Sequence, residues 1–321
     1  MATIGSDVLE AARLLMNGEL VAIPTETVYG LAANALNEEA ITQVFVTKNR
    51  PFFDPLIVHI SSFQDIEKYA QEVDRSLEKL MEEIWPGPLT VLLPKRSILS
   101  DIISNGLPRV AFRMPNHALT QELLSMLPFP LVAPSANPFK YISPTSAAHV
   151  NQQLGDKIPY ILDGGNCMVG MESTIVGVEN GEIQVYRKGG FSIENLEDIV
   201  GKKIKLHHST SNPAAPGMLD VHYSPSTKLI IGNIPNLIKK YGDQRPAILS
   251  FSEDYSHENH IDSCMVLSPS QSLDEAAKNF FGTLRMIDDQ GFSLILSEFV
   301  PEEGLGRAIN DRLRRAGTVE Y

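Results

Sequence analysis

The sequence predicts two α/β domains joined by a linker: a mixed domain with a large sheet, then a small open sheet. In the first part of the chain, short apolar runs alternate irregularly with helical patterns, as in mixed α/β domains. In the last part, strand and helix patterns alternate regularly, which favours helical crossovers between parallel strands. The segment between them is rich in turn formers and has no sustained period. We therefore expect domains at residues 1–206 and 227–321, with a linker at 207–226.

The first elements follow from capping and apolar spacing. Asp7 and Glu10 have capping-box spacing ahead of an apolar helical pattern, and Gly18 supplies a stop, which predicts a helix over residues 7–17. The other helices expected in this domain are residues 37–47, 77–85, 119–127 and 147–154. Its expected strands are residues 20–23, 56–60, 89–93, 110–112, 131–133, 160–162, 174–178 and 183–186. The second domain is expected to hold strands 228–231, 247–251, 265–267 and 293–296 and helices 237–241, 273–286 and 306–316.

Composition limits the classes of function. A chain of 321 residues with 43% apolar and 21% charged residues is ordinary for a soluble globular protein. The net charge of −12 argues against a protein that grips nucleic acid mainly by neutralising phosphates. Cys167 and Cys264 have no metal-ligand spacing, so we expect no structural zinc and no disulfide framework. With neither a secretion signal nor an apolar run of about 20 residues, the sequence predicts a cytoplasmic protein without a membrane span.

Several polar motifs follow predicted strands and indicate an anion and small-molecule site. Residues 24–31 form a dense polar cluster that indicates a binding loop. Lys48 and Arg50 would present an ammonium and a guanidinium to one phosphate or carboxylate, although such a pair is more often a solvated helix end. His59 lies in an apolar run, where a satisfied core histidine is the common alternative to a pocket wall. Arg113 would bind a substrate anion, or form a plain salt bridge.

Hydroxyl groups and glycines extend this set. Ser135 and Asn137 lie in a rigid turn after a short strand, a turn type that also occurs without function. Ser143 opens a helix, which favours either phosphate binding or simple helix capping. The glycines of 163–165 and 170–174 indicate close approach of the backbone to a neighbour. The sequence contains no Walker phosphate loop, no dinucleotide fingerprint and no Gly-x-Ser-x-Gly elbow.

Taken in order, these motifs resemble the YrdC/Sua5 family. They are PTETVYGL, KNRP, DPLIVH, WPGPLT, RMPNH, PSAN, SPT, DGG, GMEST and YRKGG. The linker APGMLDVHYSP and the segment after it resemble the two-domain Sua5 form. The resemblance implies a twisted mixed-sheet domain with an open cavity, followed by a small Rossmann-like domain. The implied activity is that of a nucleotidyltransferase, which condenses L-threonine, bicarbonate and ATP to threonylcarbamoyl-AMP and pyrophosphate.

The resemblance also implies roles for individual residues. ATP would be bound by Arg50, Asp54, Arg109, Ser135, Asn137, Ser143, Arg187 and Tyr223, and L-threonine by Thr27, His59, Arg113 and Ser173. Lys48 and Arg50 are the expected catalytic cations, which act by positioning and charge stabilisation, and no metal-ligating residue is expected. Tyr223 is the linker tyrosine that would reach back over the nucleotide. Removing residues 207–321 is therefore expected to weaken ATP turnover.

The resemblance further implies partners. Mg²⁺ would enter with ATP, and the product would pass to a separate complex that transfers the threonylcarbamoyl group to adenosine 37 of tRNA. Contact with tRNA itself would be weak or indirect. An RNA-binding or ribosome-associated factor is the alternative function, which the acidic composition disfavours. A carbamoyl phosphate enzyme is a further alternative, disfavoured by the lack of cysteine pairs. Family departures include Asp54 in place of asparagine and Lys140 in place of glycine.

Overall fold

The computed structural model describes residues 1–207, 215 and 223–320, which divide into two compact units. The first unit consists of Met1–Phe139, Pro144–Met168 and Glu172–Leu219. The second unit consists of Lys140–Ser143, Val169–Met171 and Asp220–Tyr321. Two short segments from within the predicted first domain, 1–206, thus belong to the second unit. Most of the predicted linker, 207–226, lies outside the described residues.

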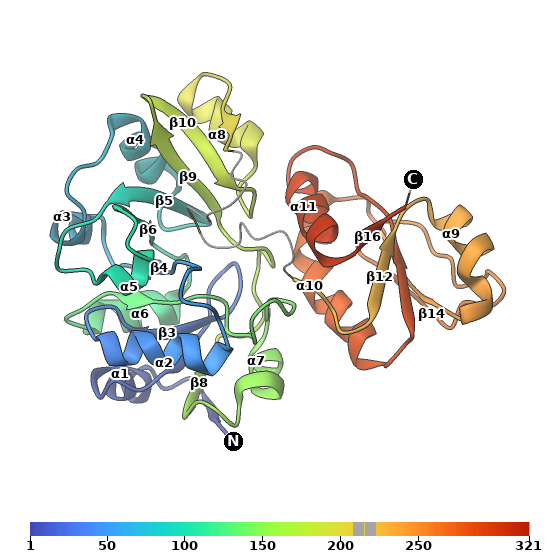
Figure 1. Cartoon of the computed structure of the whole chain (residues 1–321), viewed down its shortest axis with the longest axis horizontal. Coiled ribbons are helices and arrows are strands. Elements are labelled where there is room, and N and C mark those ends of the chain that lie inside the picture. The colour runs from blue at the N-terminus through green and yellow to red at the C-terminus, as the bar shows by residue number, and fades with distance from the viewer. Residues whose placement is uncertain (208–214, 216–222, 321) are drawn as a thin grey trace. The chain divides into compact units, whose positions relative to one another are not determined.

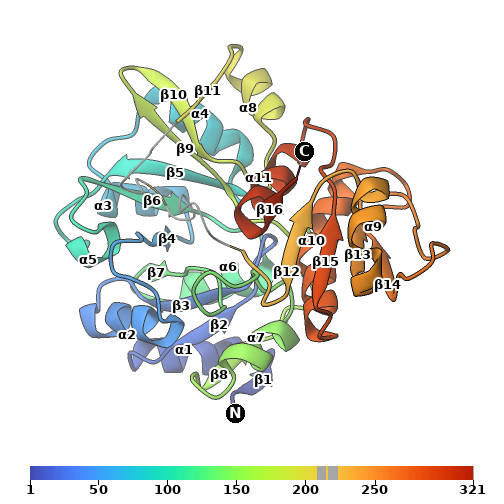
Figure 2. The same cartoon turned by 45° about the vertical axis from the view of Figure 1, so that its right-hand side comes forward.

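The first unit is built on an eleven-stranded mixed sheet (Figures 1 and 2). Its described strands, in spatial order, are β1 (Thr3–Gly5), β8 (Tyr160–Leu162), β2 (Val21–Ile23), β3 (Gly30–Asn34), β7 (Leu131–Val132), β4 (Ile57–His59), β6 (Arg109–Arg113), β5 (Leu89–Pro94), β9 (Thr174–Glu179), β10 (Glu182–Arg187) and β11 (Lys205–Leu206). Central strands β4 and β6 are parallel, whereas β5 and β7 run antiparallel to their neighbours β6 and β4. The predicted mixed α/β class is confirmed.

Helices cover this sheet, and their caps explain where they begin. They are α1 (Val8–Met16), α2 (Glu38–Lys48), α3 (Ile66–Tyr69), α4 (Arg75–Ile84), α5 (Asp101–Ser104), α6 (Ala118–Met126), α7 (Ala147–Leu154) and α8 (Ile193–Val200). The Asp7 carboxylate accepts hydrogen bonds from the backbone of Leu9 and Glu10, which confirms the predicted cap of α1. Glu10 does not complete a capping box, because its carboxylate pairs with Arg13 at 2.7 Å.

The central strands of the sheet are buried on both faces, which explains their near-continuous apolar sequences. Along β2, Val21 and Ile23 pack into one cluster with α1 and α6, while Ala22 packs into the other cluster. The larger cluster also takes in Val58 and Phe112 from the central strands. Polar side chains at the ends of β4 and β6 therefore project from a rigid, well-packed support.

Some elements of the first unit differ from expectation. Strand β3 (Gly30–Asn34) was not predicted, because its alanines have low strand propensity and it begins inside the polar motif 24–31. Helix α8 was also not predicted, although Ile193, Leu196 and Val200 have helical apolar spacing. Strand β1, helices α3 and α5 and the two-residue β11 lack a strong apolar period. Short elements of this kind are held by tertiary contacts rather than by their own sequence pattern.

The second unit is a five-stranded sheet in which all described pairings are parallel. Its strands, in spatial order, are β14 (Ser263–Val266), β13 (Ala247–Ser250), β15 (Leu294–Ser297), β12 (Lys228–Ile231) and β16 (Thr318–Val319). Its helices are α9 (Ile234–Tyr241), α10 (Leu273–Asp289) and α11 (Gly306–Ala316). Helix α9 packs on one face of the sheet, and α10 and α11 cover the other (Figure 2). Helices on both faces of a parallel sheet match the Rossmann-like arrangement expected.

Segments 140–143 and 169–171 pack within the second unit. The buried guanidinium of Arg285 on α10 donates hydrogen bonds to the backbone oxygens of Ile142 and Ser143. It also lies 5.0 Å from the ring centre of Tyr141, whose hydroxyl donates to Asp288 at 2.6 Å. Arg285 therefore secures a segment that precedes it by more than a hundred residues in the sequence.

Candidate functional site

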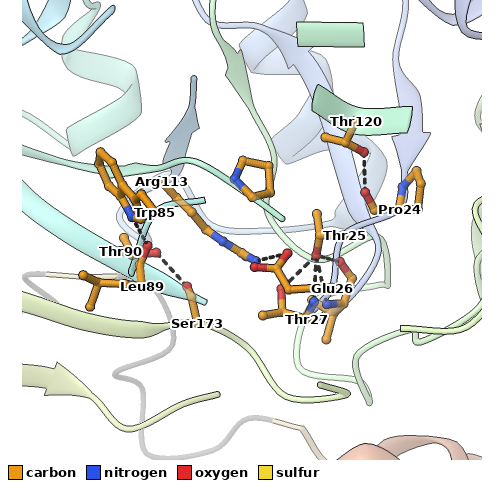
Figure 3. A network of polar contacts seen from close by, with 12 residues as sticks. Pro24, Thr25, Glu26, Thr27, Trp85, Leu89, Thr90, Arg113, Thr120 and Ser173 are labelled. Atoms are coloured by element: carbon orange, nitrogen blue, oxygen red, sulfur yellow. Dashed lines mark hydrogen bonds and ion pairs between the residues drawn. The ribbon is translucent and has the colours of Figure 1, made fainter. Parts of the chain in front are cut away.

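Arg113 occupies the centre of the candidate site, at the last position of β6. The strand register places it beside His59 on parallel β4 and beside Thr90 on antiparallel β5. Arg113 is 4% exposed, so its guanidinium is withdrawn from bulk water. Figure 3 shows its side chain extending toward the loop that carries Glu26 and Thr27. The predicted threonine-binding residues thus come from two separate strands, β4 and β6, and from two loops.

Glu26 is the partner of Arg113. A guanidinium nitrogen of Arg113 lies 2.8 Å from Oε2 of Glu26, and the side chains are 5% and 8% exposed. The Nε of Arg113 and both carboxylate oxygens of Glu26 are buried without a well-aligned hydrogen bond. A buried pair with unused donors and acceptors is costly for folding alone, and such groups commonly serve a ligand.

Ser173 connects the threonine group with Arg187. The Ser173 hydroxyl lies 2.6 Å from that of Thr90, and Figure 3 shows both beside Arg113. Arg187, at the end of β10, donates to the Ser173 hydroxyl at 3.1 Å and to its backbone oxygen at 2.9 Å. Ser173 was predicted to bind threonine and Arg187 to bind ATP, and the two side chains are in direct contact.

The binding loop 24–31 is held by its own hydroxyl groups. The Thr25 hydroxyl donates to the backbone oxygen of Val28 and lies 2.8 Å from the hydroxyl of Thr27. Thr120 on α6 donates to the backbone oxygen of Pro24, as Figure 3 shows. These bonds leave little freedom to the backbone around Glu26 and explain why the motif carries two threonines.

His59 is a neutral imidazole in this environment. It is 2% exposed, and its Nδ1 lies 3.3 Å from the backbone oxygen of Ile57. Burial, together with the positive charge of Arg113, lowers the pKa of His59 to about 3. If Nδ1 carries the proton toward Ile57, Nε2 is left as a hydrogen-bond acceptor.

A second cluster is built around Lys48 and the turn 134–137. The Lys48 ammonium donates to the backbone oxygens of Ser135 and Asn137, each at 2.5 Å. Lys48 is 1% exposed, and burial, followed by the nearby charge of Arg50, holds the pKa of its ammonium well below the usual value. The alternative of a solvated helix end therefore does not hold for Lys48, because its ammonium is buried and fixes the turn that carries Ser135 and Asn137.

Arg50 and Asp54 complete this second cluster. Arg50 is separated from Asp54 by 3.0 Å and also donates to the backbone oxygens of Asp54 and Pro55. Both side chains are buried. The turn 134–137 lies beside the binding loop, because Ser135 forms a bridge with Gly30 at the start of β3. The cation cluster and the threonine group therefore line neighbouring stretches of the same unit.

Three predicted ATP-binding residues are members of neither cluster. Arg109 is at the opposite end of β6 from Arg113, about 13 Å away along the strand. There it donates to Tyr186 and to the backbone oxygen of Val178, and it lines a cavity of about 320 Å³. Ser143 belongs to the second unit, as does Tyr223, which packs against Phe281 on α10. The hydrogen-bond partners of Arg109 thus belong to strands β9 and β10.

Glu26 and Thr90 are the site residues that sequence reasoning did not select. The signal for Glu26 was its place as the acidic residue among the hydroxyl and apolar residues of the loop. Its importance depends on Arg113, which is 87 positions away in the sequence, so no local pattern could link the two. Thr90 has no motif signal beyond its place at the end of WPGPLT.

Fold and site together define an α/β protein whose first unit holds buried cations beside hydroxyl groups at the ends of its sheet strands. Residues 13–189 match the family model of Sua5, YciO and YrdC proteins, described as "Telomere recombination", and residues 191–318 match "Threonylcarbamoyl-AMP synthase, C-terminal domain". The chain belongs to the Sua5/YrdC family, in its two-domain Sua5 form.

Individual relatives agree with this assignment over nearly the whole chain. The threonylcarbamoyl-AMP synthase of Pyrococcus abyssi is 39% identical over 317 residues, which cover 95% of this chain and 92% of the relative. That of Bacillus subtilis strain 168 is 36% identical and covers 98% and 94%. The crystal structure of P. abyssi Sua5 complexed with L-threonine superposes with a TM-score of 0.92 at 36% identity, covering 100% of this chain and 99% of that chain.

Proposed function

We propose that this chain is a threonylcarbamoyl-AMP synthase, which condenses L-threonine, bicarbonate and ATP to L-threonylcarbamoyladenylate and pyrophosphate. The observation that carries the proposal is the buried group of Arg113, His59, Thr27 and Ser173. It offers a cation for a carboxylate and neutral polar groups for a hydroxyl. The P. abyssi relative, solved with L-threonine, supports the same substrate.

The nucleotide is assigned to Arg187 and to the cation cluster, which is the second cluster described above: Lys48, Arg50, Asp54 and the turn 134–137. Arg50 and Arg187 are planar donors suited to phosphate, and the turn at Ser135 and Asn137 offers further polar groups. Lys48 contributes by holding that turn through two backbone oxygens. The role proposed for this lysine is therefore the placement of nucleotide-binding groups, with its charge adding to the local positive field.

The proposed chemistry needs no covalent protein intermediate. The threonine amine and bicarbonate form a carbamate and water, and a carbamate oxygen then attacks the α-phosphorus of ATP as pyrophosphate leaves. Fixed cations stabilise the crowded anions, and the buried site limits hydrolysis of the carbamate. Mg²⁺ is proposed to arrive on the ATP phosphates, because Asp54, the acid of the cation cluster, is already paired with Arg50.

The proposed product has a use outside this chain. We propose that a separate tRNA threonylcarbamoyltransferase complex receives the adenylate and modifies adenosine 37, so that the synthase needs at most weak contact with tRNA. The net charge of −12 fits this division of work. A cytoplasmic location is proposed on a separate ground, because Cys167 and Cys264 are both free thiols, as is usual in a reducing compartment. Among the residues that the structure describes, no helix is long and apolar enough to cross a membrane.

The test is a reconstitution with purified full-length protein, ATP, Mg²⁺, bicarbonate and radiolabelled L-threonine. Labelled adenylate and pyrophosphate should form together, and omission of any one substrate should abolish both. Pyrophosphate release that does not depend on threonine would contradict the proposal and indicate another carbamoyl-adenylate reaction. Absence of turnover beside salt-sensitive RNA binding would favour the RNA-binding alternative.

A further inference from the structure

The ion pair between Arg113 and Glu26 has more hydrogen-bonding capacity than it uses. A terminal guanidinium nitrogen of Arg113 lies 2.8 Å from Oε2 of Glu26. Even so, neither the Arg113 Nε nor either Glu26 oxygen has a well-aligned hydrogen bond. Both side chains are more than nine-tenths buried. Charged groups in such a setting pay a desolvation penalty that a poorly aligned pair does not repay.

The surroundings do not remove this deficit. His59, beside Arg113, is neutral. The hydroxyls of Thr25 and Thr27 bond to each other, and that of Thr25 also donates to the backbone oxygen of Val28. Ser173 is engaged with Thr90 and Arg187. The spare donors of the guanidinium and the spare acceptors of the carboxylate therefore await groups of opposite charge from outside the protein.

An α-amino acid carries both of those groups on one carbon atom. Its carboxylate suits the fork of a guanidinium, and its ammonium suits a carboxylate acceptor. When both ends bind, the single misaligned pair is replaced by two charge-assisted contacts, so the net charge of the buried site does not change. A ligand with only one charged end would leave Glu26 or Arg113 without a partner.

We propose that Glu26 binds the α-ammonium group of the amino-acid substrate, while Arg113 binds its α-carboxylate. This inference rests on the proposed function and deepens it, because it names the residue that recognises the amine that becomes carbamoylated. Glu26 acts as a specificity residue: it selects α-amino acids over α-hydroxy acids of the same shape. Thr27, His59 and Ser173 are left to recognise the side-chain hydroxyl.

The test compares two ligands by calorimetry on the full-length chain. L-Threonine and 2,3-dihydroxybutanoate, with matching configuration, differ only in having an amine or a hydroxyl at the α-carbon. Glu26→Gln should lower the affinity for L-threonine at least tenfold. The same variant should leave the affinity for 2,3-dihydroxybutanoate unchanged or raise it, because the neutral amide no longer competes for Arg113. Opposite responses to the two ligands cannot come from a general loss of structure.

Controls separate this role from a structural one. Glu26→Asp, which keeps the charge on a shorter side chain, should lose less threonine affinity than Glu26→Gln. Glu179 is a half-buried carboxylate on β9, and Glu179→Gln should change the affinity for neither ligand. In the synthase assay, Glu26→Gln should raise the KM for threonine far more than the KM for ATP.

The outcomes also separate the inference from the proposed function. Equal weakening of both ligands by Glu26→Gln and Glu26→Asp, or no effect on either ligand, would overturn the role of Glu26 alone. If the wild-type chain bound no L-threonine at all, the proposed function would be overturned together with the inference. Tighter binding of L-threonine than of the hydroxy acid by the wild type, lost in Glu26→Gln, is the expected result.

Discussion

Burial sets the charge state of single residues at this site, and His59 shows it most directly. Its pKa of about 3 lies below the ordinary value of 6.5, because burial and Arg113 both disfavour the imidazolium. Between these values the unfolded chain binds a proton that the folded chain does not bind. Folding stability from this group is therefore present above pH 6.5 and is lost as the pH falls toward 3.

Replacing His59 should reduce this dependence on pH. Lowering the pH from 7 to 5 should cost the wild type about 2 kcal/mol more than it costs His59→Gln. Urea unfolding at the two pH values measures the difference. His257→Gln, at a largely exposed position, is the control and should follow the wild type. Equal pH slopes for wild type and His59→Gln would show that the imidazole is not held neutral.

Lys48 gives a second prediction at this scale. Lys48→Met should lower the free energy of unfolding by about 2–4 kcal/mol, because two buried backbone oxygens, of Ser135 and Asn137, lose their donor. It should also lower synthase activity, since the turn 134–137 loses its support. Urea unfolding measures the first effect. Lys157→Ala is the control. It removes a weaker surface contact, 3.4 Å from the Lys157 ammonium to the backbone oxygen of Thr47, and should change the free energy of unfolding by at most about 0.5 kcal/mol.

At the scale of elements, prediction from sequence succeeded where apolar period and caps agree. Helix α11 has the predicted bounds, and Asp7 caps α1 as expected. It failed for β3, whose alanines gain strand structure from pairing with β2 and β7. The same contrast holds at the site: the cations follow motif positions, whereas the Arg113–Glu26 pair depends on tertiary pairing that no local pattern encodes.

Gly170 provides a prediction about packing between elements. Its φ is +73°, and an added Cβ would lie 2.5 Å from the backbone oxygen of Lys278 on α10. Gly170→Ala should therefore cost about 3 kcal/mol or more, the sum of left-handed strain and a backbone clash. Gly181 is a matched control, because its φ is +76° but no atom lies within 4 Å of the added Cβ.

Thermal unfolding of the two glycine variants separates the two causes. Gly181→Ala should cost only about 1 kcal/mol, from strain alone. A Gly170→Ala variant no less stable than Gly181→Ala would mean that segment 169–171 does not pack on α10 as described. The closeness that the glycine motif indicated in the sequence is in this case closeness to a helix of the second unit.

At the scale of the whole molecule, the predicted substrate groups divide unequally between the two units. All the residues assigned to L-threonine lie in the first unit, namely Thr27, His59, Arg113 and Ser173, whereas Ser143 and Tyr223 of the ATP group lie in the second. The sequence could not show this division, since Ser143 precedes the predicted boundary at 206 by more than sixty positions. Its segment is secured by Arg285.

A truncated chain of residues 1–206 tests the consequence. It should bind L-threonine within about twofold of the full chain, but its synthase turnover should fall at least tenfold, because Tyr223 and the support of segment 140–143 are gone. Unchanged turnover would contradict this role of the second unit.

The buried thiol of Cys167 gives experimenters a built-in reporter. Burial, and next the charge of Glu26, raise the pKa of Cys167 to about 12, and its side chain is 4% exposed. Alkylating reagents attack the thiolate, so this cysteine can be labelled only when the structure around the binding loop opens. In the Cys264→Ser variant, which lacks the other cysteine, the labelling rate of Cys167 reports the rate of that opening. If L-threonine slows the labelling, the difference between the two labelling rates would measure how often the site opens without ligand, and no attached probe would be needed.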